Sequence, residues 1–431
     1  MSVRLKRVSC EDVPELRPAV DASVVGRTAE IVESVRSGGL SALRELCVRF
    51  DNADPDAPLV VERDELEQAW RALDPEERAL LERTTARIQS FASAQRERMG
   101  ETRLKVPGGW VGNTLHAVGS AGCYAPGGRH PLPSSVLMTV VPAVVAGVQR
   151  VVVASPRGDT VTRAAAWIAG ADQLLVAGGA HAIGALAYGV EGLPRVDLIV
   201  GPGNAWVTAA KKHVFGTVGI DMLAGPSELV VLADESAEPA RVAADLLAQA
   251  EHDDQALPVL VTTCAELVGR VERELERQLK SLPTAATARA ALDNGFAVVA
   301  QTLTAAVSVC NRLAPEHLAV ATQGAADVAA RLDGCSAVFI GTGAAEALGD
   351  YGIGPNHVLP TGGGARFGGG LSVATFVRSR SFVEIEDESA ASETVRDAAR
   401  LARLEGLEAH ARSAELRLVP QGVSARADVE A

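Results

Sequence analysis

Several familiar signatures are missing from this sequence. Its six cysteines include no CxxC pair, which is typical of neither a disulfide framework nor a thiolate zinc site. Aromatic residues make up only 3% of the chain, so Ala, Val, Leu and Ile must build the core, a composition that suits buried parallel strands flanked by helices. The longest apolar tract, 136–148, is interrupted by Thr139 and Pro142 and is shorter than the roughly 20 residues of a membrane span.

The chain also has fewer basic than acidic residues. The net charge of -13 argues against a nucleic-acid partner, which would require a basic face. No apolar stretch follows the basic residues at the N-terminus, so no signal peptide is predicted. We therefore expect a cytoplasmic protein without membrane or nucleic-acid partners.

Standard nucleotide and hydrolase motifs are incomplete or missing. Residues 201–206 begin like GxGxxG, but Trp206 stands where the third glycine belongs. The sequence has no GK pair for a Walker loop, no HExxH and no GxSxG. These motifs alone predict no more than an α/β protein that binds a small molecule.

What the sequence does contain is a repeated order of apolar run, glycine turn and helical pattern after residue 122. The runs are 151–154, 173–176, 197–200, 229–232, 259–261 and 337–340. This order predicts two Rossmann-like, doubly wound parallel sheets, with ligands at the strand ends that carry the glycines. Before them the first 120 residues look mostly helical, with 62–99 broken at Pro75, and 389–418 form a helical tail after the sheet pattern fades near Gly370.

Four of the eight histidines stand beside acids or amides, namely His252, His317, His357 and His410. Gln249 and His252 are three residues apart on a predicted helix and share one face, so both could hold one ion. A set of imidazoles, a carboxylate and an amide suits zinc or a similar divalent metal. Each histidine alone is more readily explained as a hydrogen-bonded structural residue than as a ligand, and spacing does not show that residues 249, 252, 350 and 410 converge.

Two further segments could carry chemistry. Glu316 and His317 are adjacent, and both can act as bases near neutral pH, although a loop or helix-start pair is an equal interpretation. Residues 224–228 form a predicted tight turn that could present Ser227 to a ligand. No base lies near Ser227 in sequence, so it is a weak candidate nucleophile.

Eight segments in order resemble one family, histidinol dehydrogenase. They are 124–128, 201–205, 220–228, 249–252, 315–318, 349–351, 356–361 and 370–373, so that the resemblance covers roughly residues 120 to 410. The resemblance implies oxidation of L-histidinol through the aldehyde to L-histidine with two NAD. It also implies one zinc ion per subunit and an intertwined homodimer.

The resemblance assigns roles to individual residues. It implies zinc held by Gln249, His252, Asp350 and His410, with His410 from the other subunit. Histidinol would lie on the zinc against Ser134, Ser227, His317, His357 and Glu405, the last also from the partner chain. Tyr124 and Asn204 match the family's NAD contacts. His317 would take the alcohol proton, and Glu316 would activate the water that adds to the aldehyde.

With these roles we expect four parts in the chain. They are an arm over 1–22, a discontinuous Rossmann-like domain over 23–122 and 228–370 with most zinc and catalytic residues, a cofactor-binding domain over 123–227, and a tail over 371–431 that packs on the partner subunit.

Three positions depart from the family pattern. His181 stands where the family usually has a cofactor-contacting Gln, which predicts an altered NAD affinity. Ala314 replaces the Gly usually found before Pro-Glu-His, and Gly368-Gly369 replaces a serine pair.

Three other functions are weighed against this one. A related zinc- and NAD-dependent dehydrogenase of a sulfonated diol is disfavoured because Glu405 would attract an ammonium and repel a sulfonate. A zinc hydrolase with Glu316 as the water activator would bind no NAD. An inactive dimeric scaffold is disfavoured because no catalytic position implied by the resemblance is lost.

Overall fold

The computed structural model describes residues 3–127 and 131–418. The chain divides into two compact units. The main unit holds residues up to Arg96 and the segment Val118–Phe376, and the tail unit holds Glu97–Ala117 together with the residues after Phe376. Within the described residues, no helix is both long and apolar enough to cross a membrane. The two units are described separately below.

The first sheet of the main unit has six strands in the order β2-β7-β6-β5-β8-β9. Their bounds are β2 Val60–Glu62, β5 Ser120–Tyr124, β6 Arg150–Ser155, β7 Gln173–Val176, β8 Leu198–Val200 and β9 Gly219–Ile220. All neighbours pair in parallel except the edge strand β2, which pairs antiparallel with β7.

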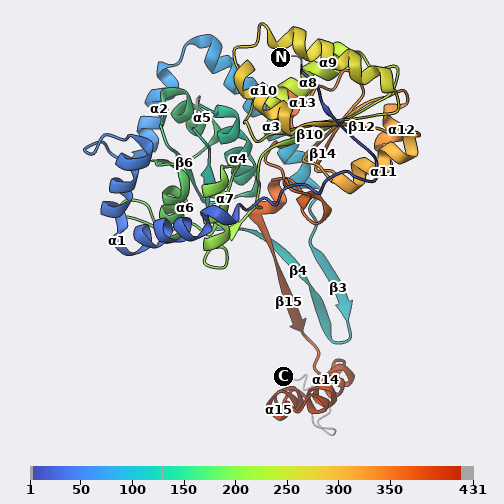
Figure 1. Ribbon diagram of the computed structural model, residues 1–431. Helices are drawn as coiled ribbons and strands as arrows, with labels where there is room; N and C mark the ends of the chain where they lie inside the picture. The colour runs from blue at the N-terminus through green and yellow to red at the C-terminus, as the bar shows by residue number, and fades with distance from the viewer. Residues whose placement is uncertain (1–2, 128–130, 419–431) are drawn as a thin grey trace, which may run out of the picture. The chain divides into compact units, whose positions relative to one another are not determined.

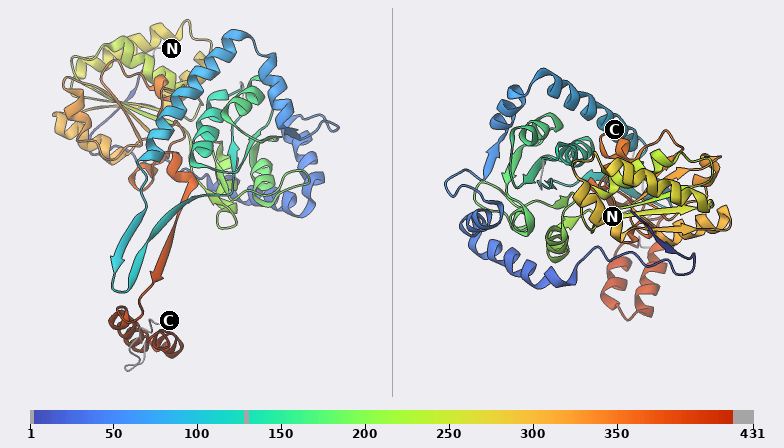
Figure 2. Two further views of the ribbon diagram at one scale, coloured as in Figure 1. Left: turned by 180° about the vertical axis from the view of Figure 1, so that it is seen from behind. Right: turned by 45° about the horizontal axis from the view of Figure 1, so that its top comes forward.

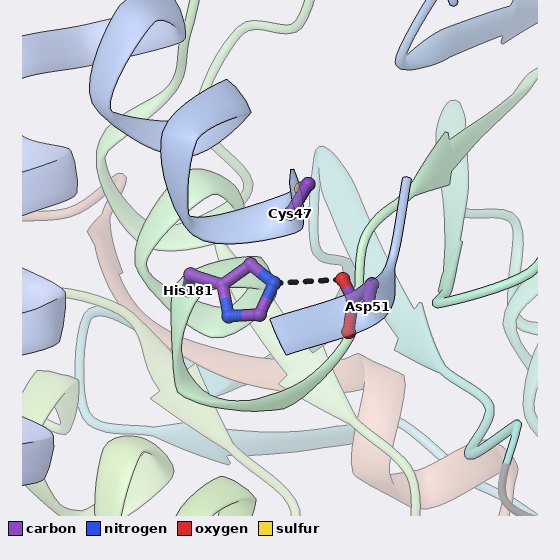
Figure 3. Close-up of side chains that lie close together, drawn as sticks. All are labelled: Cys47, Asp51 and His181. Carbon is purple, nitrogen blue, oxygen red and sulfur yellow. Dashed lines mark hydrogen bonds and ion pairs between the residues drawn. The ribbon is translucent and has the colours of Figure 1, made fainter. Parts of the chain in front are cut away.

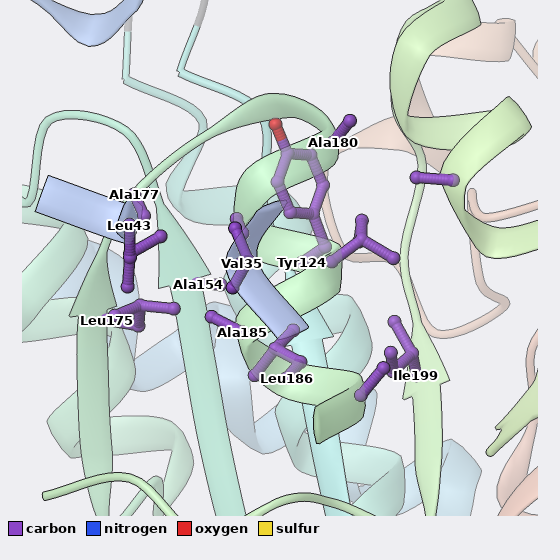
Figure 4. Packing of buried hydrophobic residues seen from close by; sticks show 14 of the residues in the cluster. Val35, Leu43, Tyr124, Ala154, Leu175, Ala177, Ala180, Ala185, Leu186 and Ile199 are labelled. Carbon is purple, nitrogen blue, oxygen red and sulfur yellow. The ribbon is translucent and has the colours of Figure 1, made fainter. Parts of the chain in front are cut away.

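Helices cover both faces of the first sheet (Figure 1). Helices α1, α6 and α7 pack together on one face, and α2, α4 and α5 pack on the other. The bounds are α1 Val25–Asp51, α2 Arg63–Ala72, α4 Pro133–Ala146, α5 Thr160–Ala169, α6 Gly179–Tyr188 and α7 Ala205–Val214. Figure 4 shows small and branched side chains such as Val35, Leu186 and Ile199 filling the layer between α1, α6 and the strands. Few aromatics are needed because alanines let helix and sheet approach closely.

The second sheet of the main unit also has six strands, all parallel, in the order β1-β12-β11-β10-β13-β14. The bounds are β1 Lys6–Val8, β10 Glu228–Ala233, β11 Leu257–Thr262, β12 Phe296–Val299, β13 His317–Ala321 and β14 Ala337–Ile340. Leu229 and Val231 pack into the core under α8, α9 and α10, whereas Val230 and Leu232 pack under α11 and α12. Both faces are therefore buried, as parallel strands require.

Seven further helical segments complete the main unit. They are α3 Pro75–Glu97, α8 Pro239–Ala250, α9 Ala265–Leu279, α10 Ala285–Asn294, α11 Leu303–Leu313, α12 Ala325–Ala329 and α13 Glu346–Asp350. The views in Figure 2 show the second sheet with its helices as a separate layer system from the first.

The tail unit is an antiparallel three-stranded sheet followed by two helices. The strands are β3 Thr102–Val106, β4 Gly109–Ala117 and β15 Val377–Ile385, with β4 in the centre. The helices α14 Ser392–Leu404 and α15 Glu408–Glu415 pack on each other, and Arg403 forms ion pairs with Glu408 and Glu415. Many large apolar side chains of this unit stay exposed in the single chain, among them Val383 and Leu404.

The predicted fold class is confirmed, since two parallel sheets carry helices on both faces. Runs 173–176 and 337–340 are β7 and β14 at the expected bounds, and the break at Pro75 separates α2 from α3. The prediction that the first 120 residues are mostly helical is wrong for 102–117, which form β3 and β4. The expectation that the sheet pattern fades near Gly370 is wrong for Val377–Ile385, which form β15. These strands belong to a thin sheet with little buried surface, so they lack the apolar runs that mark the other strands.

The expected domain grouping differs from the observed packing at one point. Residues 23–122 were grouped with 228–370, but β2 and β5 belong to the first sheet and α1 packs on α6. The chain therefore forms α1, which covers one face of the first sheet, and β2, which lies at its edge, before it forms that sheet's inner strands.

Ala314, one of the three departures from the family pattern, has a left-handed backbone with φ of 50° at the end of α11. Glycine is the residue that adopts this conformation without a side-chain penalty. The alanine at this position is therefore strained, directly before the Pro315-Glu316-His317 segment.

Gly201 illustrates how tightly the first sheet's loops are packed. It follows β8 with φ of 115°, and a Cβ added there would lie 2.1 Å from the carbonyl oxygen of Tyr124. Gly192 also has a positive φ, 80°, but nothing lies within 4 Å of its added Cβ. Substitution of Gly192 therefore introduces backbone strain alone, whereas substitution of Gly201 introduces backbone strain and a steric clash.

We predict that Gly192→Ala lowers the free energy of unfolding by about 1 kcal/mol, from backbone strain alone. Gly201→Ala should lose roughly 1–3 kcal/mol more, because a neighbouring backbone must move. Urea unfolding of both variants measures this difference. Equal losses in the two variants would contradict the packing described for Gly201.

Candidate active site

The chain passes directly from β9, the last strand of the first sheet, to β10, an inner strand of the second sheet. Residues 221–227 join the carboxyl end of β9 to the amino end of β10. Glu228 begins β10, Glu316 precedes β13, and His317 begins β13 beside Leu229. The candidate catalytic residues therefore lie at the amino edge of the second sheet, whereas the glycine turns of the first sheet lie at its carboxyl edge.

Helices α8 and α13 bring four metal-binding types of side chain to the same place. Gln249 is on the last turn of α8 and His252 follows that helix, while Glu346 and Asp350 lie one turn apart on α13. The Nε2 atom of His252 is 3.4 Å from Oδ2 of Asp350. One ligand atom each from His252, Glu346 and Asp350 lie within 4.8 Å of one another.

The hydrogen bonding of this cluster is incomplete. Gln249 is 0% exposed, and within the described part of the chain neither its amide nitrogen nor its carbonyl oxygen has a hydrogen-bond partner. The same holds for both carboxylate oxygens of Glu346, which is 1% exposed. Buried polar groups are costly without a partner, and a divalent metal would supply one. The donors are nitrogen and oxygen atoms, which suits zinc and similar ions.

A second cluster of metal-binding types of residue, Cys47, Asp51 and His181, differs from the first (Figure 3). Nε2 of His181 lies 2.8 Å from Oδ2 of Asp51, and that oxygen also accepts a hydrogen bond from the amide of Gly178. The Cys47 thiol faces the carbonyl of Val176. Because these groups satisfy one another, this cluster needs no metal and acts as a structural link between α1 and the turn before α6.

Glu316 and His317 point into the first cluster and are both buried. Nδ1 of His317 is 3.7 Å from the Glu316 carboxylate and 3.2 Å from that of Glu346, while Nε2 faces Asp350 at 3.9 Å. Burial lowers the pKa of His317 to about 4 and raises the pKa of Glu316 well above its usual value. His317 is therefore a neutral imidazole at pH 7 and can accept a proton.

The acid at position 316 is held by its neighbour on β10. The amide of Glu228 donates to Glu316 Oε2 at 2.9 Å, and the amide of Glu316 donates to Glu228 Oε2 at 3.3 Å. The side chain of Ser227 also donates to Glu316 and lowers its pKa against the larger effect of burial. This reciprocal pairing locks β10 to the start of β13.

Among the residues expected to bind substrate, His357 has a contact at each ring nitrogen. Its Nδ1 contacts the carbonyl of Asp350 at 2.9 Å, and its Nε2 contacts Oγ of Ser135 at 3.4 Å. Ser134, which the sequence singled out, is half-buried on the first turn of α4 beside Ser135. The structure thus brings Ser227, Gln249, His252, Glu316, His317, Asp350 and His357 to one region of the main unit.

Two other expected residues belong to the tail unit. Glu405 ends α14 and His410 lies on α15, and both are exposed in the single chain. The cluster formed by the main unit therefore includes neither of them, and their roles stay predictions.

Tyr124 and Asn204, the expected cofactor contacts, lie at the carboxyl edge of the first sheet after β5 and β8. The strand order reverses between these two strands, which is where open α/β sheets bind ligands. The Tyr124 hydroxyl accepts from the amide of Gly179 at 3.0 Å, and Asn204 Oδ1 caps α7 by accepting from Trp206 and Val207.

The turn between β8 and α7 is held by a buried ion pair of Lys211 and Asp221. Lys211 Nζ donates to the Gly201 carbonyl at 3.0 Å, and Asp221 Oδ2 accepts from the Gly201 amide at 2.7 Å. A buried ion pair is stable only when its hydrogen bonds are complete, and here they fix both the amide and the carbonyl of Gly201.

Sequence reasoning missed three residues of this region, Glu346, Glu228 and Ser135. One signal was present, because Glu346 and Asp350 have the i,i+4 spacing of one helix face. His181 is 2% exposed and bonded to Asp51, so its Nε2 atom faces away from solvent rather than serving as an open ligand contact.

Comparisons with known proteins agree on one family. A family model described as histidinol dehydrogenase matches residues 16–418. The chain is 46% identical over 395 residues to a histidinol dehydrogenase of Geobacillus kaustophilus, covering 90% of this chain and 92% of the relative. It is 41% identical to that of Bacillus subtilis, covering 96% and 99%. The crystal structure of histidinol dehydrogenase from Elizabethkingia anophelis matches with a TM-score of 0.89 at 29% identity, covering 96% and 98%.

We predict that Glu228 makes stability depend on pH. Burial raises its pKa from 4.5 to about 7, so its contribution to stability is complete below pH 4.5 and is lost as the pH rises through 7. Glu228→Gln, which mimics the protonated form, should therefore gain on the wild type by roughly 3 kcal/mol between pH 4.5 and 8. Unfolding midpoints across this range measure the gain, with exposed Glu235→Gln as control. Parallel curves for wild type and Glu228→Gln would contradict the prediction.

Proposed function

Because the chain belongs to the histidinol dehydrogenase family of oxidoreductases, we propose that it oxidises L-histidinol through the aldehyde to L-histidine with two NAD and one zinc ion per subunit. One observation carries the proposal. Gln249, buried without a hydrogen-bond partner among the described residues, lies one turn before His252, which contacts Asp350, and Asp350 faces the neutral imidazole of His317. A metal-binding group and a base therefore meet in one buried region.

The zinc donors of this chain would be Gln249, His252 and Asp350. Zinc, when bound, would supply a positive centre that anchors the nitrogen atoms of histidinol and fixes its position. Asp350 already pairs with His252, and this contact, against the larger opposing effect of burial, contributes to a lowered pKa of Asp350. Asp350 is thus ionised at neutral pH, as a metal ligand must be.

His317 is the general base of the proposed reaction. Its lowered pKa keeps the ring neutral, so it can accept the proton that leaves the substrate hydroxyl. The same residue can accept a second proton from the hydrated aldehyde once the first has been released. A two-stage oxidation needs a base at both stages, and one imidazole can serve both.

Glu316 activates the water that adds to the aldehyde. A carboxylate with a raised pKa is a stronger base than an exposed one, so burial makes Glu316 suitable for this role. The amide of Glu228 and the hydroxyl of Ser227 orient it. Water is thus used only in the second stage, when the carboxylic acid is formed.

We place the dinucleotide at the carboxyl edge of the first sheet, against Tyr124 and Asn204. The acceptor atoms of both side chains are already used, Tyr124 by Gly179 and Asn204 by the first turn of α7. Each therefore has a donor left for the cofactor, the phenol proton and the amide NH2. The rigid Gly201 turn between them supports this position.

The proposed enzyme is an intertwined homodimer in which His410 completes the zinc site of the partner and Glu405 binds the substrate's ammonium. Both residues are exposed on the tail unit, together with apolar side chains such as Leu401 and Leu404. A monomer would leave this surface in water, so packing on a second copy supports the assembly. The carboxylate of Glu405 matches the positive charge of histidinol.

We predict that the wild type produces two NADH for each histidinol consumed. Glu316→Gln should produce one NADH and accumulate histidinal, because only the hydration stage needs that carboxylate. His317→Asn should slow both stages, by roughly 10²-fold or more. Absorbance of NADH and trapping of the aldehyde measure these outcomes. A yield of one NADH for the wild type would point to an ordinary alcohol dehydrogenase, and absence of dinucleotide binding to a hydrolase.

A further inference from the structure

Glu346 is a buried acid to which the mechanism above gives no role. It is the first residue of α13 and is 1% exposed. Neither of its carboxylate oxygens has a hydrogen-bond partner among the residues that the structure describes. A buried carboxyl group without a partner is costly, so its position requires a compensating interaction.

The atom that Glu346 faces most directly is a ring nitrogen of His317. Its Oε1 lies 3.2 Å from Nδ1, closer than the 3.7 Å between Nδ1 and the Glu316 carboxylate. Nδ1 also lacks a hydrogen-bond partner within the described chain. The other ring nitrogen, Nε2, faces Asp350 at 3.9 Å, on the side of the proposed substrate.

The two nitrogens of His317 therefore have different surroundings. A proton on Nδ1 can be donated to Glu346, and this leaves the lone pair on Nε2 directed towards Asp350 and the substrate side. With the opposite tautomer, Nε2 would carry the proton and could not accept one from the substrate. The ring also packs on Phe339, with centroids 5.8 Å apart, so it has an apolar neighbour on one side.

We infer that Glu346 is a positioning residue that orients His317 and keeps its proton on Nδ1, an inference that rests on the proposed role of His317. Glu346 touches neither substrate nor cofactor and acts through the imidazole. It is the orienting carboxyl of a carboxyl–imidazole pair that recurs in acid–base catalysis on unrelated folds. The short α13 serves both parts of the site, with Glu346 behind the base and Asp350 at the metal.

The competing role for Glu346 is direct metal coordination, because it lies near His252 and Asp350. Two features favour the positioning role. The 3.2 Å contact is made to His317, and no ion pair joins Glu346 to His252 among the described residues. The backbone carbonyl of Glu228 is a second acceptor near the ring, so loss of Glu346 should weaken the orientation of His317 without abolishing it.

The test compares Glu346→Ala and Glu346→Gln with a matched control, Asp245→Asn. Burial is the main cause of the raised pKa of Glu346, and the negative charge of Asp245 on α8 adds to it. No ion pair joins Asp245 to His317 among the described residues. The Asp245→Asn variant therefore removes a neighbouring charge and leaves the contact between Glu346 and His317 intact. Each variant is assayed for kcat and KM with histidinol, and for zinc content by elemental analysis. The tautomer of His317 is read from ¹⁵N shifts of histidine-labelled protein, with and without zinc.

We expect Glu346→Ala to lower kcat by roughly 10²-fold, with KM and zinc content unchanged and with proton density moved from Nδ1 in the ¹⁵N spectrum. Glu346→Gln should keep more activity, because its amide oxygen can still accept from Nδ1. Asp245→Asn should behave as the wild type in all three measurements.

Two results would overturn the inference. A loss of zinc in step with kcat would make Glu346 a metal ligand, and an unchanged tautomer in both Glu346 variants would remove its contact with His317. If the wild type forms no NADH from histidinol, the proposed function fails. The ¹⁵N spectrum of the unloaded protein would still decide whether Glu346 sets the tautomer.

Discussion

Burial without hydrogen bonding is the constraint on which the rest of this site depends. Gln249, Glu346 and Nδ1 of His317 all lie out of water, in the described chain, with no hydrogen-bond partner. Such groups are costly to a protein of marginal stability, and a ligand or a catalytic role would compensate for them. The contrast with Cys47, Asp51 and His181 is informative, because that cluster contains similar residue types and is fully satisfied. Residue type alone does not distinguish the two clusters, and hydrogen-bond satisfaction does.

The two sheets of the main unit share one strand order. When the edge strands β1 and β2 are left out, the five remaining strands of each sheet lie side by side in the order third, second, first, fourth, fifth, numbered by their order in the chain. The two copies use opposite edges, however. The first sheet presents its carboxyl edge with Tyr124 and Gly201, and the second presents its amino edge with Glu316 and His317. The seven-residue link 221–227 joins these edges directly.

Much of this arrangement could be predicted from the sequence, for identifiable reasons. Parallel strands such as β7 and β14 are short apolar runs, and these are predicted with their observed bounds. Strand β13 was not recognised, because it begins with the polar His317 of the site. The strands β3 and β15 mix charged and apolar residues, and β4 mixes glycine, polar and apolar residues, so none of them carries such a run.

The site residues were predictable mainly through the resemblance to a family, since residues 249, 317 and 350 are far apart in the chain. Glu346 was missed because two properties single it out, its burial and its lack of a hydrogen-bond partner among the described residues. Both are properties of the folded chain and cannot be seen in the sequence. The role of Glu405 and His410 is also beyond what the main unit alone can test, because both lie on the tail unit.

The central claim is that one metal site is completed by two copies of the chain. Co-expression of a differently tagged His410→Asn chain and His252→Asn chain, with isolation of the heterodimer, tests it most directly. If ligands are shared between subunits, one site carries both defects and the other is intact. Zinc should then reach one ion per heterodimer, and activity should recover towards half of the wild type. Isolated heterodimers that regain neither zinc nor activity would contradict the account.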